Sequence, residues 1–144
     1  MFIRDLLKSQ ATVSAEVHQT VLEVAGMMVH HNIGAVPVLK NGQLVGIFTE
    51  RDLMSRVVAV GKDPARTSVS EVMTDDPLTV EPKDTVETCM ALMRRHGFRH
   101  LLVCESRDLK GVVSLRDILL HDLDAKDDEV RMMRAYLHSS PDAG

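Results

Sequence analysis

A seven-residue stretch occurs twice in the chain, and it constrains the fold more than any other feature of the sequence. The copies are residues 46–52 (GIFTERD) and 111–117 (GVVSLRD), each reading glycine, two apolar residues, a hydroxyl residue, a variable residue, arginine and aspartate. At the same offset of 65 positions, residues 16–52 and 81–117 share ten identities in 37 positions. A repeat of this length predicts two related supersecondary units within one chain of 144 residues.

Each repeat has the pattern of a strand, a helix, two strands and a second helix, in that order. Short extended segments begin at Val13 and Leu78. Apolar residues at helical spacing then predict helices that end near Asn32 and Gly97, which suit a left-handed cap. In the first repeat, an Asn-Gly pair at 41–42 is a strong signal for a hairpin turn. The heptapeptide begins the closing helix of each repeat.

These patterns divide the chain into four parts. We expect a first unit at 1–60, a polar linker at 61–68, a second unit at 69–122 and a helical tail at 123–144. Helical spacing in the tail continues to about His138. Its apolar stripe predicts a homodimer, in which the helix of residues 129–138 packs on the module or on its mate. The stripe consists of Val130, Met132, Met133, Tyr136 and Leu137.

The composition disfavours several classes of function. A net charge of −4, no tryptophan and one tyrosine do not favour a nucleic-acid partner. No apolar run is long enough for a membrane span, and the first seven residues do not resemble a signal peptide, so we expect a cytoplasmic protein. Cys89 and Cys104 replace aliphatic residues of the first repeat, which predicts buried core thiols. The seven histidines show no metal-ligand spacing, and no catalytic triad is readable, so we expect neither a metal site nor an enzyme.

The heptapeptide places a hydroxyl and a carboxylate one helical turn apart, and two interpretations of this spacing remain open. Thr49 with Asp52, and Ser114 with Asp117, can cap the helix start, which stabilises a helix by about 1 kcal/mol. The same helix start offers free N–H groups and a positive dipole end to a phosphate, and the carboxylate can accept a ribose diol. The arginine before each aspartate can clamp a phosphate. Capping and binding are compatible.

The two heptapeptides resemble the G-x-x-[ST]-x-x-D signature of tandem cystathionine-β-synthase (CBS) domains. Residues 33–38 (IGAVPV) and 98–103 (FRHLLV) resemble the family's strand before the hairpin, and the resemblance covers roughly residues 3–122. It implies an α/β (α+β) fold in which two pseudo-symmetric β-α-β-β-α CBS units form one Bateman module. Such modules hold AMP, ADP, ATP, NAD or S-adenosylmethionine in clefts between the units. The chain would then be a non-enzymatic sensor that regulates an unidentified protein in trans.

The resemblance also implies roles for particular residues. Asp52 and Asp117 would hold ribose, and Thr49 and Ser114 would contact ribose or phosphate. The residues expected to line the adenine are Val13, Ala35, Val36, Pro37, Thr79, His100, Leu101 and Leu102, and the phosphate candidates are Arg51, Arg99 and Arg116.

Two departures from the family pattern make the clefts unequal. Leu102 stands where the family usually has proline, and Gly34 and Ala35 lack the basic character of Arg99 and His100. We therefore expect the Asp117 cleft to prefer the more anionic ligand. The alternative function is an oligomerisation or interaction module with vestigial clefts, and a stand-alone enzyme is the poorer hypothesis.

Overall fold

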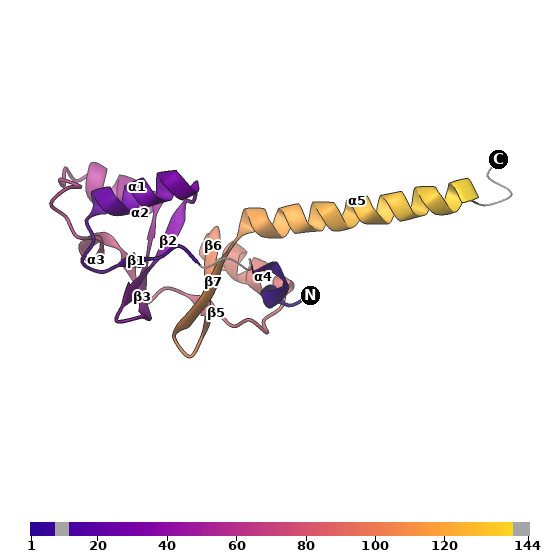
Figure 1. Ribbon diagram of the computed structural model, residues 1–144, viewed down its shortest axis with the longest axis horizontal. Coiled ribbons are helices and arrows are strands. Elements are labelled where there is room, and N and C mark those ends of the chain that lie inside the picture. The colour runs from indigo at the N-terminus through magenta and orange to yellow at the C-terminus, as the bar shows by residue number, and fades with distance from the viewer. Residues whose placement is uncertain (8–11, 140–144) are drawn as a thin grey trace.

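The first repeat forms a four-stranded sheet with helices on one face. In the computed structural model, which describes residues 1–7 and 12–139, the strands pair in the order β1-β2-β3-β4 (Figure 1). Strand β1 runs parallel to β2, and the other pairs are antiparallel. The elements are β1 (Ala15–Glu16), α1 (Val21–His31), β2 (Ala35–Lys40), β3 (Gln43–Thr49), α2 (Glu50–Asp52) and the π-helical segment η2 (Leu53–Val58), joined by α3 (Val69–Val72) and β4 (Thr74–Asp75) from the segment that precedes the second repeat.

The second repeat has the same order of elements, which confirms the predicted pattern. Its described strands pair as β5-β6-β7, with β5 parallel and β7 antiparallel to β6. A short 3₁₀ helix, η1 (Ile3–Leu6), opens the chain, and one long helix closes it. The elements of the second repeat are β5 (Thr79–Val80), α4 (Val86–His96), β6 (His100–Glu105), β7 (Asp108–Ser114) and α5 (Leu115–Ser139).

Local sequence signals account for where the helices and hairpins end. Asn32 and Gly97 are the left-handed C-caps of α1 and α4, as predicted, with φ of 52° and 71°. The turn at 41–42 has positive φ at both residues, as its Asn-Gly pair predicts. Ser106 and Arg107 also have positive φ, of 49° and 70°, so the second hairpin makes the same kind of turn without glycine.

The short helix that precedes each repeat packs on the other repeat. Ile3 is fully buried in the second core, and its N–H donates to the carbonyl of Asp84 at 2.7 Å. In return, α3 packs on the first repeat, where Val69 and Val72 join the first core. The N–H of Val69 donates to the carbonyl of Gln19 at 2.8 Å. This exchange ties the two units together through buried apolar side chains and backbone hydrogen bonds.

Each sheet buries one face in its own core and turns the other toward the neighbouring unit. Val36 and Phe48 are paired across β2 and β3, and both lie in the first core. Because side chains alternate along a strand, Ala35 and Pro37 lie on the opposite face, yet both are buried. Strands β3 and β7 contact each other, and the N–H of Leu44 reaches the carbonyl of Arg107 at 3.5 Å. The face outside each core is therefore the one that meets the other unit.

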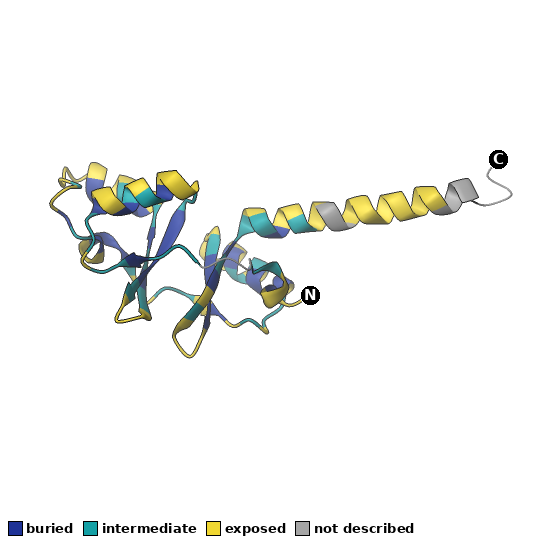
Figure 2. Ribbon diagram, viewed as in Figure 1, coloured by how far each residue is buried: buried dark blue, intermediate teal, exposed yellow. Residues whose placement is uncertain are grey.

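The second half of α5 has no partner within the described chain. Helix α5 extends away from both sheets, and residues 126–135 are all exposed (Figure 2). Residues 126–135 therefore do not pack on their own module. Of the two predicted packing surfaces for the tail, the one that remains is the second protomer of a homodimer. The side chains of 124, 125 and 136–139, and all of residues 140–144, lie outside the described set. Among the described helices, none is both long and apolar enough to cross a membrane.

Candidate functional site

The first copy of the heptapeptide forms a complete capping box at the start of α2. The N–H of Asp52 donates to the Thr49 hydroxyl oxygen at 3.2 Å, and the N–H of Thr49 donates to Asp52 Oδ2 at 3.0 Å. The Thr49 hydroxyl lies 3.1 Å from the same carboxylate oxygen and donates to it. These bonds satisfy the backbone donors at the turn and confirm the capping interpretation for this copy.

The second copy repeats this geometry at the start of α5. The N–H of Asp117 donates to the Ser114 Oγ at 3.0 Å, and the N–H of Ser114 donates to Asp117 Oδ2 at 3.1 Å. Each helix start is also hydrogen-bonded to the residue that precedes the first strand of its hairpin, β2 or β6. The N–H of Glu50 donates to the carbonyl of Gly34 at 3.0 Å, and the N–H of Leu115 donates to the carbonyl of Arg99 at 2.8 Å. The two copies are thus equivalent in their backbone.

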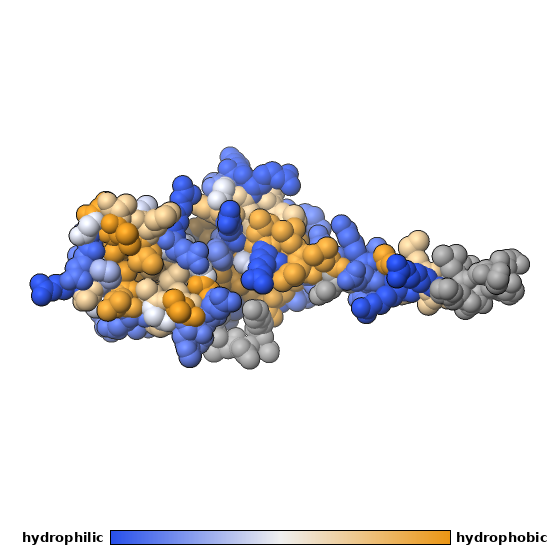
Figure 3. Space-filling model, turned by 90° about the horizontal axis from the view of Figure 1, so that it is seen from above, coloured by the Kyte–Doolittle hydropathy of each residue, from blue (hydrophilic) through white to orange (hydrophobic). Residues whose placement is uncertain are grey.

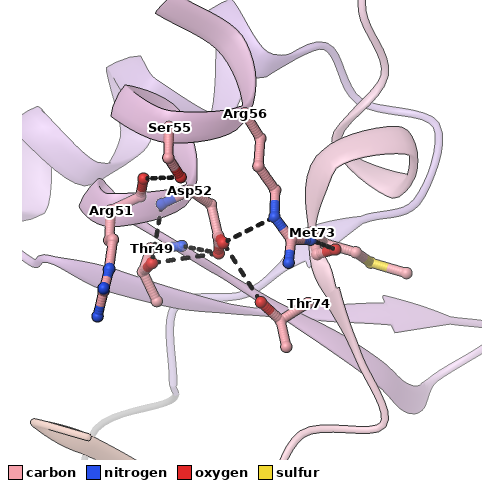
Figure 4. A network of polar contacts seen from close by, with 7 residues as sticks. All are labelled: Thr49, Arg51, Asp52, Ser55, Arg56, Met73 and Thr74. Atoms are coloured by element: carbon pink, nitrogen blue, oxygen red, sulfur yellow. Dashed lines mark hydrogen bonds and ion pairs between the residues drawn. The ribbon is translucent and has the colours of Figure 1, made fainter. Parts of the chain in front are cut away.

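Asp52 makes further contacts that the sequence analysis missed. Its Oδ1 accepts a hydrogen bond from the Thr74 hydroxyl at 3.3 Å and lies 3.7 Å from the Nε of Arg56 (Figure 4). Arg56 also donates to the carbonyl of Met73 at 2.8 Å. Both oxygens of Asp52 are therefore engaged by the protein, and the residue is only 6% exposed. Arg56 could have been found at the i+4 spacing, whereas Thr74 gave no local signal.

Asp117 is the more accessible of the two aspartates. It is half-buried, and within the described residues its hydrogen bonds are those with Ser114. The position equivalent to Arg56 is His121, and no ion pair between His121 and Asp117 is found in the described part of the chain. Asp117 Oδ1 is thus the carboxylate oxygen better placed to accept a hydrogen bond from a ligand.

The segments that the two repeats exchange, η1 with Leu7 and α3 with Met73 and Thr74, explain why the heptapeptide begins with glycine. A Cβ at Gly46 would lie 2.5 Å from Met73 Sδ and 2.9 Å from the carbonyl oxygen of Thr74. A Cβ at Gly111 would lie 2.7 Å from Leu7 Cδ2. Met73 and Leu7 each follow the short helix that packs on the other repeat. In this structure the close approach that glycine allows is therefore made by the chain itself.

His100 lies where the two units meet, close to carboxylates from both. Burial lowers the pKa of its imidazole below the ordinary 6.5, the nearby Glu50 and Asp117 carboxylates act in the opposite direction, and Arg99 adds to the lowering. Glu50 comes from the first unit, and the sequence analysis did not single it out. Its Oε1 also lies 3.1 Å from the position that a Cβ at Gly34 would take. The Asp117 side therefore carries a neutral imidazole and an acidic group from the other unit.

The other predicted site residues divide by burial. The side chains of Val36 and Leu101 lie in the two cores, 0% and 1% exposed, so only their backbone groups are available to a ligand. Leu102 is also buried, paired with Thr79 of β5. Val13 is partly buried against the first core, and the residues whose side chains are exposed are Arg51, Thr79, Arg99 and Arg116.

Within the described residues, the cysteines and histidines form no second site. Cys89 and Cys104 are buried, as predicted, and burial together with the Asp84 carboxylate raises the pKa of the Cys89 thiol to about 11. In the part of the chain that the structure describes, no three His, Cys, Asp or Glu side chains are grouped to hold a metal ion.

Comparisons with known proteins agree with this architecture. The family model of the CBS domain matches residues 3–59 and 69–124. The CBS domain-containing protein YhcV of Bacillus subtilis is 37% identical over 122 residues, which cover 84% of this chain and 85% of that protein. The CBS domain protein PAE2072 of Pyrobaculum aerophilum, solved with AMP, has a TM-score of 0.74 and 29% identity over 84% of this chain and 97% of its own.

A third relative is the CBS domain pair of protein MJ0100, solved with 5′-methylthioadenosine and S-adenosyl-L-methionine. It has a TM-score of 0.74 and 26% identity, over 82% of this chain and 96% of that chain. Both halves of the present chain match the same family model, and the solved relatives share the arrangement of paired units. The chain belongs to the CBS domain family and contains two CBS domains in tandem.

Proposed function

We propose that this chain is a regulatory sensor that binds an adenosyl ligand at the Asp117 side of its paired CBS units and acts on a partner protein in trans. The observation that carries the proposal is the accessible Asp117 carboxylate, beside His100 and at the start of a long helix. A carboxylate can accept both hydroxyls of a ribose diol, and a helix start favours a phosphate. Two solved relatives, bound to AMP and to S-adenosyl-L-methionine, support this ligand class.

In this proposal the remaining residues have subsidiary roles. Ser114 contacts ribose or phosphate, and the exposed Arg99 and Arg116 guanidinium groups supply positive charge. The sheet faces that lie outside the two cores, where Ala35 and Pro37 are found, supply the apolar surface for the adenine. The ligand is AMP, ADP, ATP, NAD or S-adenosylmethionine, and the protein carries out no reaction on it.

The Asp52 side has a different role. Thr49, Thr74 and Arg56 together engage both oxygens of the Asp52 carboxylate, so a ribose would have to displace bonds that the protein already makes. We propose that this second cleft is the weaker site. For the first unit, though not for the second, the engaged Asp52 carboxylate favours the alternative function, an interaction module with a vestigial cleft.

The direct test is to identify what the purified protein carries. The chain would be expressed, purified without added nucleotide and denatured, and the released small molecules would be identified by mass spectrometry. We expect an adenosyl compound in a ratio approaching one per chain. Release of none, combined with no rise in melting temperature on adding any of the five ligands, would leave the interaction-module alternative standing.

We also propose that the chain is a homodimer. Exposed apolar residues occur at equivalent positions of the two closing helices: Met54 and Val58 in the first repeat, Leu119 and Leu123 in the second. Each is 47–65% exposed, and these matching pairs give each repeat apolar surface that a second copy of the chain can bury. In Figure 3, hydrophobic residues cover the start of α5. Light scattering coupled to size-exclusion chromatography at micromolar concentration tests this assembly.

A further inference from the structure

The Asp52 carboxylate is surrounded by groups of the protein itself. An ionised carboxylate offers about four lone-pair sites on its two oxygens. Oδ2 accepts hydrogen bonds from the N–H and the hydroxyl of Thr49, at 3.0 and 3.1 Å. Oδ1 accepts one from the Thr74 hydroxyl at 3.3 Å and faces the Nε of Arg56 at the ion-pair distance of 3.7 Å. The carboxylate is therefore saturated, and it has no free acceptor site for a ribose diol.

The contacts of Oδ1 are separate from those that cap the helix. The capping box at the start of α2 joins Thr49 to the N–H and to Oδ2 of Asp52. Asp117 caps α5 through its own Oδ2 in the same way. Arg56 lies on η2 and Thr74 on β4, so neither belongs to the capping box. Releasing Oδ1 would therefore leave the helix start capped.

Arg56 connects Asp52 to the segment that opens the second repeat. Its Nη1 donates to the carbonyl of Met73 at 2.8 Å, while its Nε faces Asp52. Figure 4 shows the Arg56 side chain reaching from its helix to this segment, whereas Arg51 points away from Asp52. The Arg56 side chain is 50% exposed and that of Asp52 only 9%. The guanidinium can therefore move into solvent, whereas the carboxylate is held in place.

The second unit has no arginine at the position equivalent to Arg56. The residue 65 positions further along is His121. In the part of the chain that the structure describes, no ion pair joins His121 to Asp117. The two units nevertheless form the same capping box. The fold of a CBS unit therefore does not require the arginine, and its contact with the aspartate is particular to the first unit.

We propose that Arg56 and Thr74 form a latch that closes the Asp52 side to adenosyl ligands, and that releasing the latch gives the chain a second binding site. This inference rests on the proposed function, and it adds what keeps the two sides unequal. A ligand that occupies Asp52 must detach the closing helix of the first repeat from Thr74 and from the Met73 carbonyl. Both residues follow α3, which packs in the first core. Occupancy of the Asp52 side is therefore coupled to the segment that joins the two repeats.

The latch is tested by removing both of its donors in an Arg56→Met, Thr74→Val double variant. Ligand-free protein would be titrated calorimetrically with AMP and, separately, with S-adenosylmethionine. The parent should bind one ligand per chain and the double variant two. The second event should be tighter by about 10-fold or more than any second event of the parent, because hydrogen bonds to an ionised carboxylate are the strong ones to displace. Adding Asp52→Ala to the double variant should abolish the gained site.

Two further variants control this experiment. Arg66→Met removes an arginine whose Nε lies 3.8 Å from the Asp63 carboxylate, outside the site, and it should leave the stoichiometry unchanged. Arg56→Gln alone is the milder change, at a half-exposed side chain, and it serves if circular dichroism shows that the double variant does not fold. It should also tighten the second event, and a second event equal to that of the parent would overturn the latch.

The outcomes separate this inference from the function on which it rests. One site in both the parent and the folded double variant overturns the latch and leaves the Asp117 site intact. A parent that binds neither ligand contradicts the proposed function, and a site gained in the double variant would then still support the latch. No binding by the parent or by any variant overturns both.

A second site that survives Asp52→Ala would lie elsewhere on the chain and would also overturn the latch.

Discussion

The hydroxyl of Thr74 donates a hydrogen bond to Asp52 Oδ1 at 3.3 Å, from a position 22 residues further along the chain. It comes from β4, which adds an edge strand to the first sheet. Asp52 therefore caps α2 and also joins this helix to the exchanged segment that opens the second repeat. Asp117, by contrast, only caps its helix among the contacts of the described residues.

This difference predicts unequal losses of stability on removing the two carboxylates. Hydrogen bonds to a charged group are worth about 1.5–3 kcal/mol, whereas loss of a helix cap costs about 1 kcal/mol. Asp52→Ala should therefore lower the free energy of unfolding by roughly 2–3 kcal/mol and Asp117→Ala by about 1 kcal/mol. Urea denaturation of both variants measures the difference, and equal losses would contradict the structural role given to Thr74.

Glycine at position 46 is required by the exchanged segment. Gly46→Ala would bring a Cβ against Met73 Sδ and the backbone carbonyl of Thr74, so we expect a loss of about 1–3 kcal/mol, as for other overpacked sites. Gly26→Ala is the control, because nothing lies within 4 Å of its Cβ and it sits inside α1, where alanine is the better helix former by about 1 kcal/mol. In thermal denaturation, the melting temperature should fall for Gly46→Ala and rise for Gly26→Ala. An unchanged melting temperature for Gly46→Ala would show that Met73 and Thr74 move aside at little cost and would contradict this account.

The repeat, the order of elements and both capping boxes were predictable because they depend on local patterns. The caps at Asn32 and Gly97, and the helical stripes that contain Met28 and Met93, follow from residue type and spacing. The contacts of Asp52 with Thr74 and of Ile3 with the second core were not predictable, because each joins segments far apart in the sequence.

The Asp117 side was predicted to be basic, and the structure adds an acidic group there. Arg99 and His100 were recognised from the sequence, but the approach of Glu50 to His100 depends on how the two units meet. The side chains of Val36 and Leu101 were expected near the ligand, because their segments match the family strand. Alternation along β2 and β6 turns these side chains into the cores instead.

The low pKa of His100 makes stability depend on pH. Because burial favours the neutral imidazole, the unfolded chain binds the extra proton more readily once the pH falls below the ordinary 6.5. The free energy of unfolding should therefore fall as pH drops through 6.5 and level off below the folded pKa. The carboxylates of Glu50 and Asp117 limit the size of this loss. Comparing urea midpoints at pH 7.5 and 5.5, His100→Gln should lose less stability than the parent, and an identical loss would contradict the buried, neutral state.

Glu50 should weaken the binding of anionic ligands, because its carboxylate lies on the Asp117 side. An exposed charge interaction is worth up to about 1 kcal/mol, so Glu50→Gln should tighten AMP binding by roughly 2- to 5-fold. Glu87→Gln, an exposed acid in the first turn of α4, is the control and should change nothing. Weaker AMP binding by Glu50→Gln would mean that Glu50 contacts the ligand favourably.

The central claim is that Asp117 anchors an adenosyl ligand, and calorimetry on ligand-free protein tests it most directly. The parent, Asp117→Ala and Asp52→Ala would each be titrated with AMP, ADP, ATP, NAD and S-adenosylmethionine. We predict that at least one ligand binds the parent, that Asp117→Ala weakens this binding by about 10-fold or more, and that Asp52→Ala weakens it less. Absence of heat with all five ligands at millimolar concentration, or full affinity in the Asp117→Ala variant, would contradict the claim.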